Sequence, residues 1–373
     1  MIQISPETQL FIREHSSDDV RTLALQAKKY PDINMPTAIT QIAGRQVAAE
    51  KIPSWREIEE IWYPKHLSLE QCSSEITARY KARLFQGDSL TDLTGGFGID
   101  CSFLATGFKS ATYVERQEEL CEIAAHNFPI LNLNHINVRN EDGVAYLQTM
   151  SPVDCIFLDP ARRNEHGGKT VAISDCEPNV AELEALLLSK ANRVMIKLSP
   201  MLDLSLALKE LKHTQEIHIL SVNNECKELL ILLRQTSPAE IAIHCVNLLT
   251  KGTQEEQHLV FTREQEQRSQ CTYTDSLGNY LYEPNASLLK AGAFRSIAAA
   301  YPVRKLHPNS HLYISDSFIE NFPGRIFRIV NQCSFNKKEV KENLADLKKA
   351  NVTVRNFPAT VAELRKRLHL TEG

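Results

Sequence analysis

The sequence predicts an α/β protein whose central part is a mostly parallel sheet, and three observations support this fold class. Short apolar runs typical of strands alternate with helical patterns between residues 86 and 236. Three glycines follow the first of these runs within four positions, as in a strand–turn–helix unit that brings backbone close to a ligand. The last two predicted strands are joined by only five residues, too few for a crossover helix, so they pair antiparallel. We therefore expect five or so parallel strands followed by an antiparallel terminal hairpin.

Length and composition describe a globular protein with room for two or three domains. The 373 residues are 43% hydrophobic and 24% charged. Every apolar run falls well short of the ~20 residues that span a bilayer, and the N-terminus lacks the basic and apolar segments of a secretory signal. Nine cysteines are scattered without a C-x-x-C pair, which indicates reduced thiols in a cytoplasm and neither disulfides nor zinc ligands. We expect a cytoplasmic protein without a membrane segment or a metal site.

Residues 1–85 are expected to form a helical N-terminal domain. Helical patterns separated by prolines cover Thr8–His15, Val20–Tyr30, Ala38–Ala49, Trp55–Ile61 and Ser68–Phe85. The run Ser68-Leu69-Glu70-Gln71 is a capping box that predicts the start of the last helix. Because this helix leads directly into the first strand, one of its faces could cover a bound ligand. The simpler alternative is a subdomain that only packs against the next one.

Residues 86–236 form the predicted central domain. Strands are expected near 89–93, 111–115, 135–138, 154–159, 193–198, 216–222 and 228–234, with helical patterns between the first five and another at 202–212. In an open parallel sheet, ligands bind beyond the carboxyl ends of the strands. Four acids fall at such ends: Asp92, Glu115, Asp142 and Asp159. We therefore expect these four side chains to share one edge of the sheet.

The glycine turn is the motif on which the functional interpretation depends. Gly95, Gly96 and Gly98 leave no Cβ in the path of a ligand and permit positive φ. The dinucleotide fingerprint G-x-G-x-x-G would need Gly or Ala at position 101, where Cys101 stands, so a dehydrogenase is a disfavoured alternative. The acid just before the turn, Asp92, instead suits a ligand with a charged amine and no pyrophosphate.

Together with the acids at the strand ends, these motifs resemble those of the class I S-adenosylmethionine (SAM)-dependent methyltransferases, whose sheet is Rossmann-like. The resemblance implies that SAM is the cofactor and that it is held by Asp92, Thr94, Gly95, Gly96 and Gly98. It also implies that Glu115 accepts both ribose hydroxyls and that Asp142 reads the adenine amino group. The neighbouring Glu141 could take the role of Asp142.

The family's catalytic loop corresponds to Asp159-Pro160-Ala161-Arg162. Methyltransferases acting on exocyclic base amines usually carry a second proline and an aromatic residue after the first proline, and this chain has Ala161 and Arg162 at those two positions. The arginine resembles the Asp-Pro-Pro-Arg of uracil C5 enzymes, but those need a cysteine after the fifth strand, where this chain has Lys197-Leu198-Ser199-Pro200. The resemblance therefore implies direct displacement at a nitrogen, with Asp159 and a backbone carbonyl orienting the acceptor and Pro160 stiffening the loop.

Three basic residues near this loop are candidates for contact with the substrate. Arg162 and Arg163 either hold a phosphate or stack on a base, or one of them forms a salt bridge with an acid such as Asp175. Lys197 ends a buried-type strand at the same edge, so it either touches the substrate or extends to solvent as a surface lysine.

Beyond residue 236 we expect a small β-rich bridging domain at 237–284 and a basic α/β domain at 285–373. Strands are predicted near 240–246, 258–262, 312–315, 325–332 and 352–357, and helices near 287–300, 337–350 and 360–368. The chain stops soon after the last of these helices, where a split α/β module would normally add a strand. A sequence truncated at its C-terminus is therefore one interpretation.

Charge is unevenly distributed along the chain. From residue 286 to the end there are 15 Lys and Arg against 7 Asp and Glu, a net +8, whereas the remainder carries −12. A basic module of this kind suggests a polyanionic partner, and a solvated helix face is the alternative. The run from Glu283 to Gly292 resembles the start of the THUMP-like domain found behind some bacterial methyltransferases. Because THUMP modules bind RNA, this resemblance implies RNA as the partner.

These inferences combine into a cytoplasmic SAM-dependent methyltransferase that modifies a nitrogen of an RNA base. One alternative is a methyltransferase that acts on a small molecule or a protein. Another is a non-catalytic RNA-binding protein that retains the methyltransferase fold.

Overall fold

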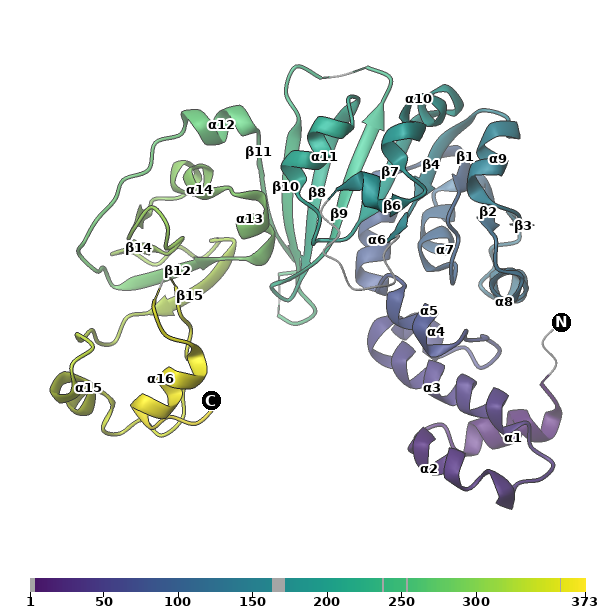
Figure 1. The fold of residues 1–373 in the computed structure, drawn as a ribbon, viewed down its shortest axis with the longest axis horizontal. Helices are drawn as coiled ribbons and strands as arrows, with labels where there is room; N and C mark the ends of the chain where they lie inside the picture. The colour runs from purple at the N-terminus through teal and green to yellow at the C-terminus, as the bar shows by residue number, and fades with distance from the viewer. Residues whose placement is uncertain (1–3, 163–171, 237, 253, 356) are drawn as a thin grey trace. The chain divides into compact units, whose positions relative to one another are not determined.

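The structure is a computed structural model that describes residues 4–162, 172–236, 238–252, 254–355 and 357–373. These residues fold into two compact units. The first contains Met1–Leu220 and Lys227–Ile241, and the second contains Ser221–Cys226 and Ala242–Gly373. Figure 1 shows the helices and strands in their order along the chain. The sheet that carries the glycine turn belongs to the first unit.

The N-terminal segment is helical, as predicted. Its helices are α1 (Pro6–Glu14), α2 (Val20–Leu25), α3 (Met35–Lys51), α4 (Pro53–Arg56), α5 (His66–Gln71) and α6 (Glu75–Leu84), with a short 3-10 helix η1 at Ala27–Lys29. Ser5, Asp19 and Asn34 precede α1, α2 and α3, and the side chain of each accepts a backbone N–H three residues later. These caps satisfy N–H groups that have no partner within the first helical turn.

The single helix predicted over Ser68–Phe85 is wrong, because the segment forms α5 and α6 with a break between them. Helix α5 begins at His66, so Ser68 lies inside it and does not cap it. The break has a tertiary cause. Ser73, which lies within it, donates its hydroxyl to a carboxylate oxygen of Asp100 at 2.7 Å in the buried interior. Local helical propensity continues through this segment, so the sequence pattern does not reveal the break.

The sheet of the first unit confirms the predicted fold class. Its strands are β1 (Gly87–Asp92), β2 (Phe108–Glu115), β3 (Ile136–Asn140), β4 (Val153–Leu158), β7 (Ala191–Leu198), β8 (Thr214–Val222) and β9 (Glu225–Arg234), in the order β8-β9-β7-β4-β1-β2-β3. Five of them, β1, β2, β3, β4 and β7, are parallel neighbours, and β9 pairs antiparallel with β7. The turn between β8 and β9 is Asn223–Asn224, and both residues have positive φ, as in the two-residue turns that suit hairpins.

Helices and short strands connect the strands of this sheet. The helices are α7 (Ile99–Ala105), α8 (Glu118–Ile130), α9 (Gly143–Thr149), α10 (Val180–Lys190) and α11 (Leu204–Glu210), with a 3-10 helix η2 at Ile173–Asp175. Beyond the end of β4, β5 (Ala161–Arg162) pairs antiparallel with β6 (Cys176–Glu177). Helix α6 packs against α7, and α9 packs against α10 (Figure 1).

The N-terminal helices share a hydrophobic core with the glycine turn. Trp55, Tyr63 and Leu69 are buried in the same cluster as Phe97 and Ile99, which flank the last glycine of the turn. The rings of Trp55 and Phe97 meet edge to face with their centroids 5.3 Å apart, a favourable aromatic geometry. This core fixes α5 beside the carboxyl edge of the sheet.

The second unit contains an antiparallel hairpin and a four-stranded sheet. The strands of the hairpin are β10 (Ala242–Leu248) and β11 (Glu256–Phe261), and the sheet has the order β13 (Arg304–Lys305), β14 (Tyr313–Ser315), β12 (Tyr280–Pro284), β15 (Gly324–Arg328). The helices are α12 (Arg263–Arg268), α13 (Ala286–Ala291), α14 (Phe294–Ala300), α15 (Lys337–Leu344) and α16 (Val361–Leu368).

Two predicted elements of the second unit are wrong. The helix expected over 287–300 is divided into α13 and α14, because Gly292 adopts φ 74° and ends the first of them. Of the segment 352–357, the five residues that the structure describes form no strand. Among the described residues of the whole chain, no helix is long and apolar enough to cross a membrane.

Candidate functional site

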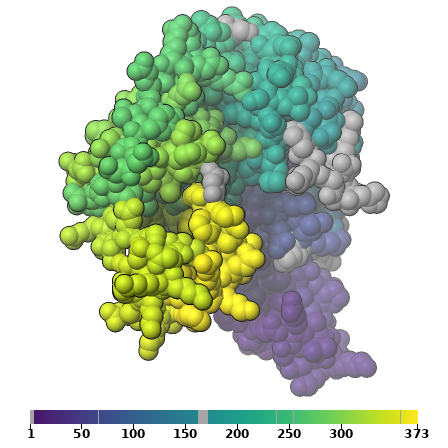
Figure 2. All heavy atoms as spheres, turned by 60° about the vertical axis from the view of Figure 1, so that its left-hand side comes forward, coloured from purple at the N-terminus to yellow at the C-terminus, as the bar shows by residue number. Residues whose placement is uncertain are grey.

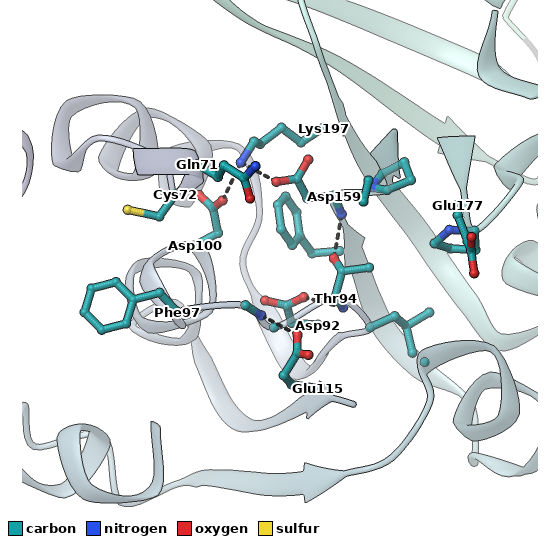
Figure 3. Close-up of a pocket in the computed structure, with 18 of the residues that line it drawn as sticks. Gln71, Cys72, Asp92, Thr94, Phe97, Asp100, Glu115, Asp159, Glu177 and Lys197 are labelled. Atoms are coloured by element: carbon teal, nitrogen blue, oxygen red, sulfur yellow. Dashed lines mark hydrogen bonds and ion pairs between the residues drawn. The ribbon is translucent and has the colours of Figure 1, made fainter. Parts of the chain in front are cut away.

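A pocket of about 1260 Å³ lies at the carboxyl edge of the sheet in the first unit (Figure 3). The ends of β1, β2, β4 and β7 and one side of α5 contribute to its walls. Every residue predicted to bind the cofactor lines this pocket: Asp92, Thr94, Gly95, Gly96, Gly98, Glu115 and Asp142. The predicted catalytic residues Asp159, Pro160 and Lys197 line it as well. The structure therefore brings candidates from the ends of five strands, β1, β2, β3, β4 and β7, into one cavity.

The glycine turn is shaped by contacts that exclude side chains. Gly96 and Gly98 have φ of 53° and 87°, a region that L side chains rarely adopt. A Cβ on Gly95 would come within 2.2 Å of the ring of Tyr113, which is fully buried and donates its hydroxyl to the carbonyl of Gly96 at 2.5 Å. The bare backbone of this turn is thus held rigidly at the wall of the pocket.

Asp92 offers a buried carboxylate oxygen without a partner. Its side chain is 1% exposed, and Oδ1 accepts the backbone N–H of Thr94 at 3.0 Å. Oδ2 has no hydrogen-bond partner in the described part of the chain. Burial raises the pKa of Asp92 to about 8, the Thr94 N–H opposes this rise, and the nearby acids Asp100, Asp159 and Glu115 add to it. Such an oxygen is costly unless a donor or a cation reaches it.

Glu115, at the end of β2, is oriented by two backbone N–H groups. Oε2 accepts the N–H of Gly96 and Oε1 that of Gln117, both at 2.9 Å. Each carboxylate oxygen has two lone pairs, so both retain the capacity to accept a further hydrogen bond from a ligand. Fixed in this way, the carboxylate can receive two adjacent hydroxyl groups.

Asp142 is the N-cap of α9, and its Oδ1 accepts the backbone N–H groups of Val144 and Ala145, both at 3.0 Å. It lines the pocket, whereas its neighbour Glu141 is not among the lining residues. Of the two acids considered at this position, the geometry favours Asp142.

The end of β4 is tied to the glycine turn. The backbone N–H of Asp159 donates to Thr94 Oγ1 at 2.6 Å, which links the loop after β4 to the loop after β1 (Figure 3). The Asp159 side chain is 36% exposed, and among the described residues only Lys197 Nζ contacts its carboxylate, on Oδ2 at 2.6 Å. Burial raises the pKa of Asp159, and Lys197 opposes the rise. Its other oxygen is available to a ligand in the pocket.

Lys197 is buried, so the interpretation as a surface lysine is wrong. The residue is 8% exposed. Its Nζ lies 2.6 Å from Asp159 Oδ2, 3.2 Å from Asp100 Oδ2 and 3.0 Å from Ser73 Oγ. Figure 3 shows the ammonium group between the two carboxylates. Burial alone would lower the pKa of Lys197, but Asp100, Asp159 and Glu228 raise it well above its ordinary value. The side chain therefore carries a permanent positive charge at neutral pH.

A second lysine extends this charged cluster away from the pocket. Lys81 is fully buried, with Nζ 2.5 Å from Glu228 Oε2, 2.9 Å from Ser73 Oγ and 2.9 Å from Asp100 Oδ1. The last contact is electrostatic, because Asp100 Oδ1 accepts no well-angled hydrogen bond in the described residues. Burial would raise the pKa of Asp100, but Lys197 and Lys81 hold it well below its usual range.

Sequence reasoning missed four members of this cluster: Ser73, Lys81, Asp100 and Glu228. One signal was present, because a lysine in a buried-type strand such as Lys197 requires a buried anion close by. The sequence could not say which acid supplies it, since the partners come from a helix start and from strands far along the chain.

The two candidate arginines cannot be placed in this way. Arg162 ends the short strand β5, but its side chain lies outside the described part of the structure, and Arg163 lies outside it altogether. Their predicted roles in substrate binding, and the alternative salt bridge to Asp175, therefore stay predictions.

Helix α5 forms one wall of the pocket and also packs into the core beside the glycine turn. Leu67 and Gln71 line the pocket, and Leu67 is 65% exposed, unusual for a large apolar side chain. Pro178, Asn179 and Pro200 line it from other segments. The pocket thus has an apolar and amide-bearing part beyond the acids, near the loop after β4.

Comparisons with known proteins cover the whole chain. Residues 280–323 match the model of a ferredoxin-like domain, and residues 324–373 match a THUMP domain-like family. A crystal structure of a candidate methyltransferase from Porphyromonas gingivalis W83 is 34% identical, with a TM-score of 0.86, and the match covers 100% of this chain and 94% of the other. No curated protein matches the sequence.

Two further solved structures overlap only in part. A Streptococcus mutans protein described as a candidate methyltransferase in complex with SAH is 12% identical, covers 43% of this chain and 96% of its own, and has a TM-score of 0.31. TrmK of M. capricolum in complex with S-adenosyl-homocysteine is 12% identical, covers 43% and 68%, and has a TM-score of 0.34. These similarities are too low to support inferences about this chain.

Proposed function

The chain belongs to the class I SAM-dependent methyltransferases that carry a THUMP-like domain at their C-terminus, and from this premise we propose that it methylates a nitrogen of an RNA base. The family follows from the 34% identical relative that it matches over its whole length. One observation carries the cofactor part of the proposal: the buried, unpartnered Oδ2 of Asp92 beside a turn with no room for side chains.

The pocket fits SAM in three places. The unpartnered oxygen of Asp92 suits a cationic group, and the oriented carboxylate of Glu115 suits the two ribose hydroxyls. Asp142 lines the pocket after β3, where an acid can accept the adenine amino group. Gly95 and Gly96 let the nucleoside lie against bare backbone. These residues would hold the cofactor, and the loop after β4 would face its methyl group.

When bound, SAM supplies a methyl group whose carbon–sulfur bond breaks with its electron pair left on sulfur, as the acceptor nitrogen's lone pair forms the new bond. The chain's own residues bind and orient the acceptor. Asp159 accepts a hydrogen bond from the acceptor N–H, aligns the lone pair and takes up the proton that the methylated nitrogen loses. Thr94 fixes the backbone of this residue, and Pro160 limits the freedom of the loop.

The RNA part of the proposal is supported by charge and by the family match at the C-terminus. Residues 286–373 carry a net +8, and residues 324–373 match a THUMP domain-like family. Lys337, Lys338 and Lys341 on α15 are exposed. Figure 2 shows the surface of this C-terminal segment, coloured yellow-green to yellow. A cytoplasmic location is consistent with nine cysteines that are all free thiols.

The most direct test is mass spectrometry of nucleosides from the RNA of a strain that lacks the gene. We expect one methylated nucleoside to disappear and to return when the purified protein and SAM are added to that RNA. Unchanged nucleosides in both tRNA and rRNA would contradict the RNA part and favour a small-molecule or protein substrate.

Asp159→Ala separates binding from chemistry. We expect calorimetry to show nearly unchanged SAM affinity, because Asp159 faces the acceptor, and we expect methyl transfer to be lost. Asp159→Asn, which keeps the size of the side chain, should be almost as inactive. Full activity in either variant would remove Asp159 from the proposed role.

Binding assays distinguish the remaining alternatives. Lys337, Lys338 and Lys341 changed together to Glu should weaken binding of bulk RNA and lower its salt dependence. The matched control changes the exposed Lys28 and Lys29 of η1 to Glu and should leave binding intact. A protein that shifts RNA but gives no heat with SAM would be a non-catalytic binder, the second alternative.

A further inference from the structure

Five side chains form a buried charged network that begins at the pocket and runs into the interior. In order, Asp159 contacts Lys197, Lys197 contacts Asp100, Asp100 contacts Lys81, and Lys81 contacts Glu228. These residues come from the end of β4, from β7, α7 and α6, and from β9. Only Asp159 is substantially exposed, at 36% of its side chain. Burying this many charged groups costs desolvation free energy, which suggests that the network has a role beyond packing.

Counting donors and acceptors shows how completely the lysines are occupied. An ammonium group has three N–H donors and no acceptor. Lys197 Nζ has three oxygen neighbours within 3.2 Å, on Asp159, Asp100 and Ser73. Lys81 Nζ likewise has three within 2.9 Å, on Glu228, Asp100 and Ser73. Each ammonium group is therefore surrounded by three protein oxygens, two of which accept hydrogen bonds from it and one of which is an ion-pair partner.

Ser73 connects the two lysines. Its Oγ accepts from Lys81 at 2.9 Å and from Lys197 at 3.0 Å, and it donates to Asp100 Oδ2 at 2.7 Å. A hydroxyl has one donor and two lone pairs, so this serine is fully used. The break between α5 and α6 places it there.

We propose that Ser73, Lys81, Asp100, Lys197 and Glu228 are positioning residues that clamp one oxygen of Asp159 and reserve its other oxygen for the N–H of the methyl acceptor. This inference rests on the proposed function. It assigns Lys197 to the positioning of Asp159 and not to contact with the acceptor. It also narrows the substrate class, because an acceptor that meets Asp159 Oδ1 must offer a hydrogen on the nitrogen to be methylated. A base amino group or a protonated ring nitrogen of the amide type has this hydrogen.

The charges that face Asp159 predict opposite effects for two substitutions. Burial is the main cause that raises the pKa of Asp159; Lys197 from β7 lowers it, Asp100 from α7 raises it, and Lys81 from α6 lowers it. Asp92 on β1 also lies near Asp159, and the charge of Asp159 raises the pKa of Asp92. Removing the Lys197 charge should therefore raise the pKa of Asp159, and neutralising Asp100 should lower it.

The test is a carbon-13 NMR titration of protein labelled at the aspartate carboxyl carbons, with the Asp159 signal assigned by its absence in Asp159→Asn. We expect Lys197→Met to move the midpoint up by about 1–3 pH units, as for an acid that loses a close cation. Asp100→Asn, which keeps the size of the side chain, should move it down by less. Asp88→Asn removes an exposed acid paired with Lys109 and should leave it unchanged.

Two results would overturn the proposal: a midpoint that moves in neither variant, or one that moves in the same direction in both. A network with a purely structural role would lower thermal stability without this opposed pattern. Should Lys197→Met fail to fold, Lys197→Gln is the second variant, with the same upward shift expected. Calorimetry with SAM on the unlabelled wild-type protein reports on the proposed function separately, since the titration needs neither SAM nor an acceptor.

Discussion

SAM binding should release a proton from Asp92. The cofactor-free carboxyl is buried, Oδ2 has no partner in the described residues, and the pKa is about 8. Below this pH the group is mostly neutral, whereas a cationic ligand favours the carboxylate. Binding and ionisation are therefore linked, and the apparent affinity should rise as the pH is raised.

The magnitude follows from that pKa. At pH 7 about one carboxyl in ten is ionised, and at pH 6 about one in a hundred. If only the carboxylate holds the cation, the apparent Kd should fall about ninefold from pH 6 to pH 7, equivalent to about 1.3 kcal/mol. The amine of the ligand itself titrates near pH 8, so the comparison is made below pH 7.5.

The assay is isothermal titration calorimetry with SAM at pH 6.0, 6.5 and 7.0, in two buffers with different heats of ionisation. The difference in heat between the buffers counts the protons released, and we expect about one per SAM at pH 6.5. Asp92→Asn should bind more weakly and with no pH dependence in this range. Asp88→Asn, which changes an exposed acid on the same strand, should retain the wild-type slope.

An affinity that is flat with pH, together with no proton release, would refute this reasoning. It would mean that Asp92 is ionised before SAM arrives or does not face its cation. Weak binding by Asp92→Asn that keeps the wild-type slope would point to a different titrating group.

Three further predictions follow from the same site. Glu115→Ala should weaken SAM binding tenfold or more, because a hydrogen bond to a charged group is worth about 1.5–3 kcal/mol. The control Glu118→Ala, which changes an exposed residue, should not weaken it. An unchanged SAM affinity of Glu115→Ala in calorimetry would place the ribose elsewhere. Gly95→Ala should lower the free energy of unfolding by about 1–3 kcal/mol and impair SAM binding, since the new methyl meets the ring of Tyr113 at 2.2 Å; a denaturant midpoint equal to that of wild type would contradict the clash. Burial raises the pKa of Asp92 in the folded state, so the free energy of unfolding should fall as the pH rises from about 4 to about 8. Asp92→Asn should therefore be about 2–5 kcal/mol more stable than wild type at pH 9 and nearly equal to it at pH 3.5. Urea denaturation at the two pH values checks this prediction, and equal stability of the two proteins at pH 9 would argue against a raised pKa.

Strand positions and the cofactor candidates were predictable because they depend on local patterns. Apolar runs of strand length, with helical patterns between them, placed seven strands, whereas the two-residue strands β5 and β6 were not predicted. The carboxyl ends of parallel strands meet at one edge, so Asp92, Glu115 and Asp142 could be grouped from the sequence alone. Glycines at positions of positive φ, such as Gly98, are likewise a local requirement.

The helix predicted across Ser73 was wrong for a reason that lies outside its own segment. Helical propensity runs unbroken across Ser73, and only the buried lysines and Asp100 explain why the helix stops there. The sequence also left open whether Lys197 touches the substrate or extends to solvent, because the answer depends on residues outside its own segment. A lysine at the end of a strand has one sequence context whether it reaches solvent or an interior carboxylate.

The sequence by itself determined the class of sheet, the order of its strands along the chain and the edge at which the acids gather. Periodicity and turn chemistry depend on residues that lie a few positions apart, so they can be recognised in the sequence alone. Only the tertiary structure decided which oxygen of Asp159 is occupied, which lysine occupies it, and that α5 forms a wall of the pocket. Those outcomes depend on partners many residues apart, whose charges must be paired once water is excluded from the interior.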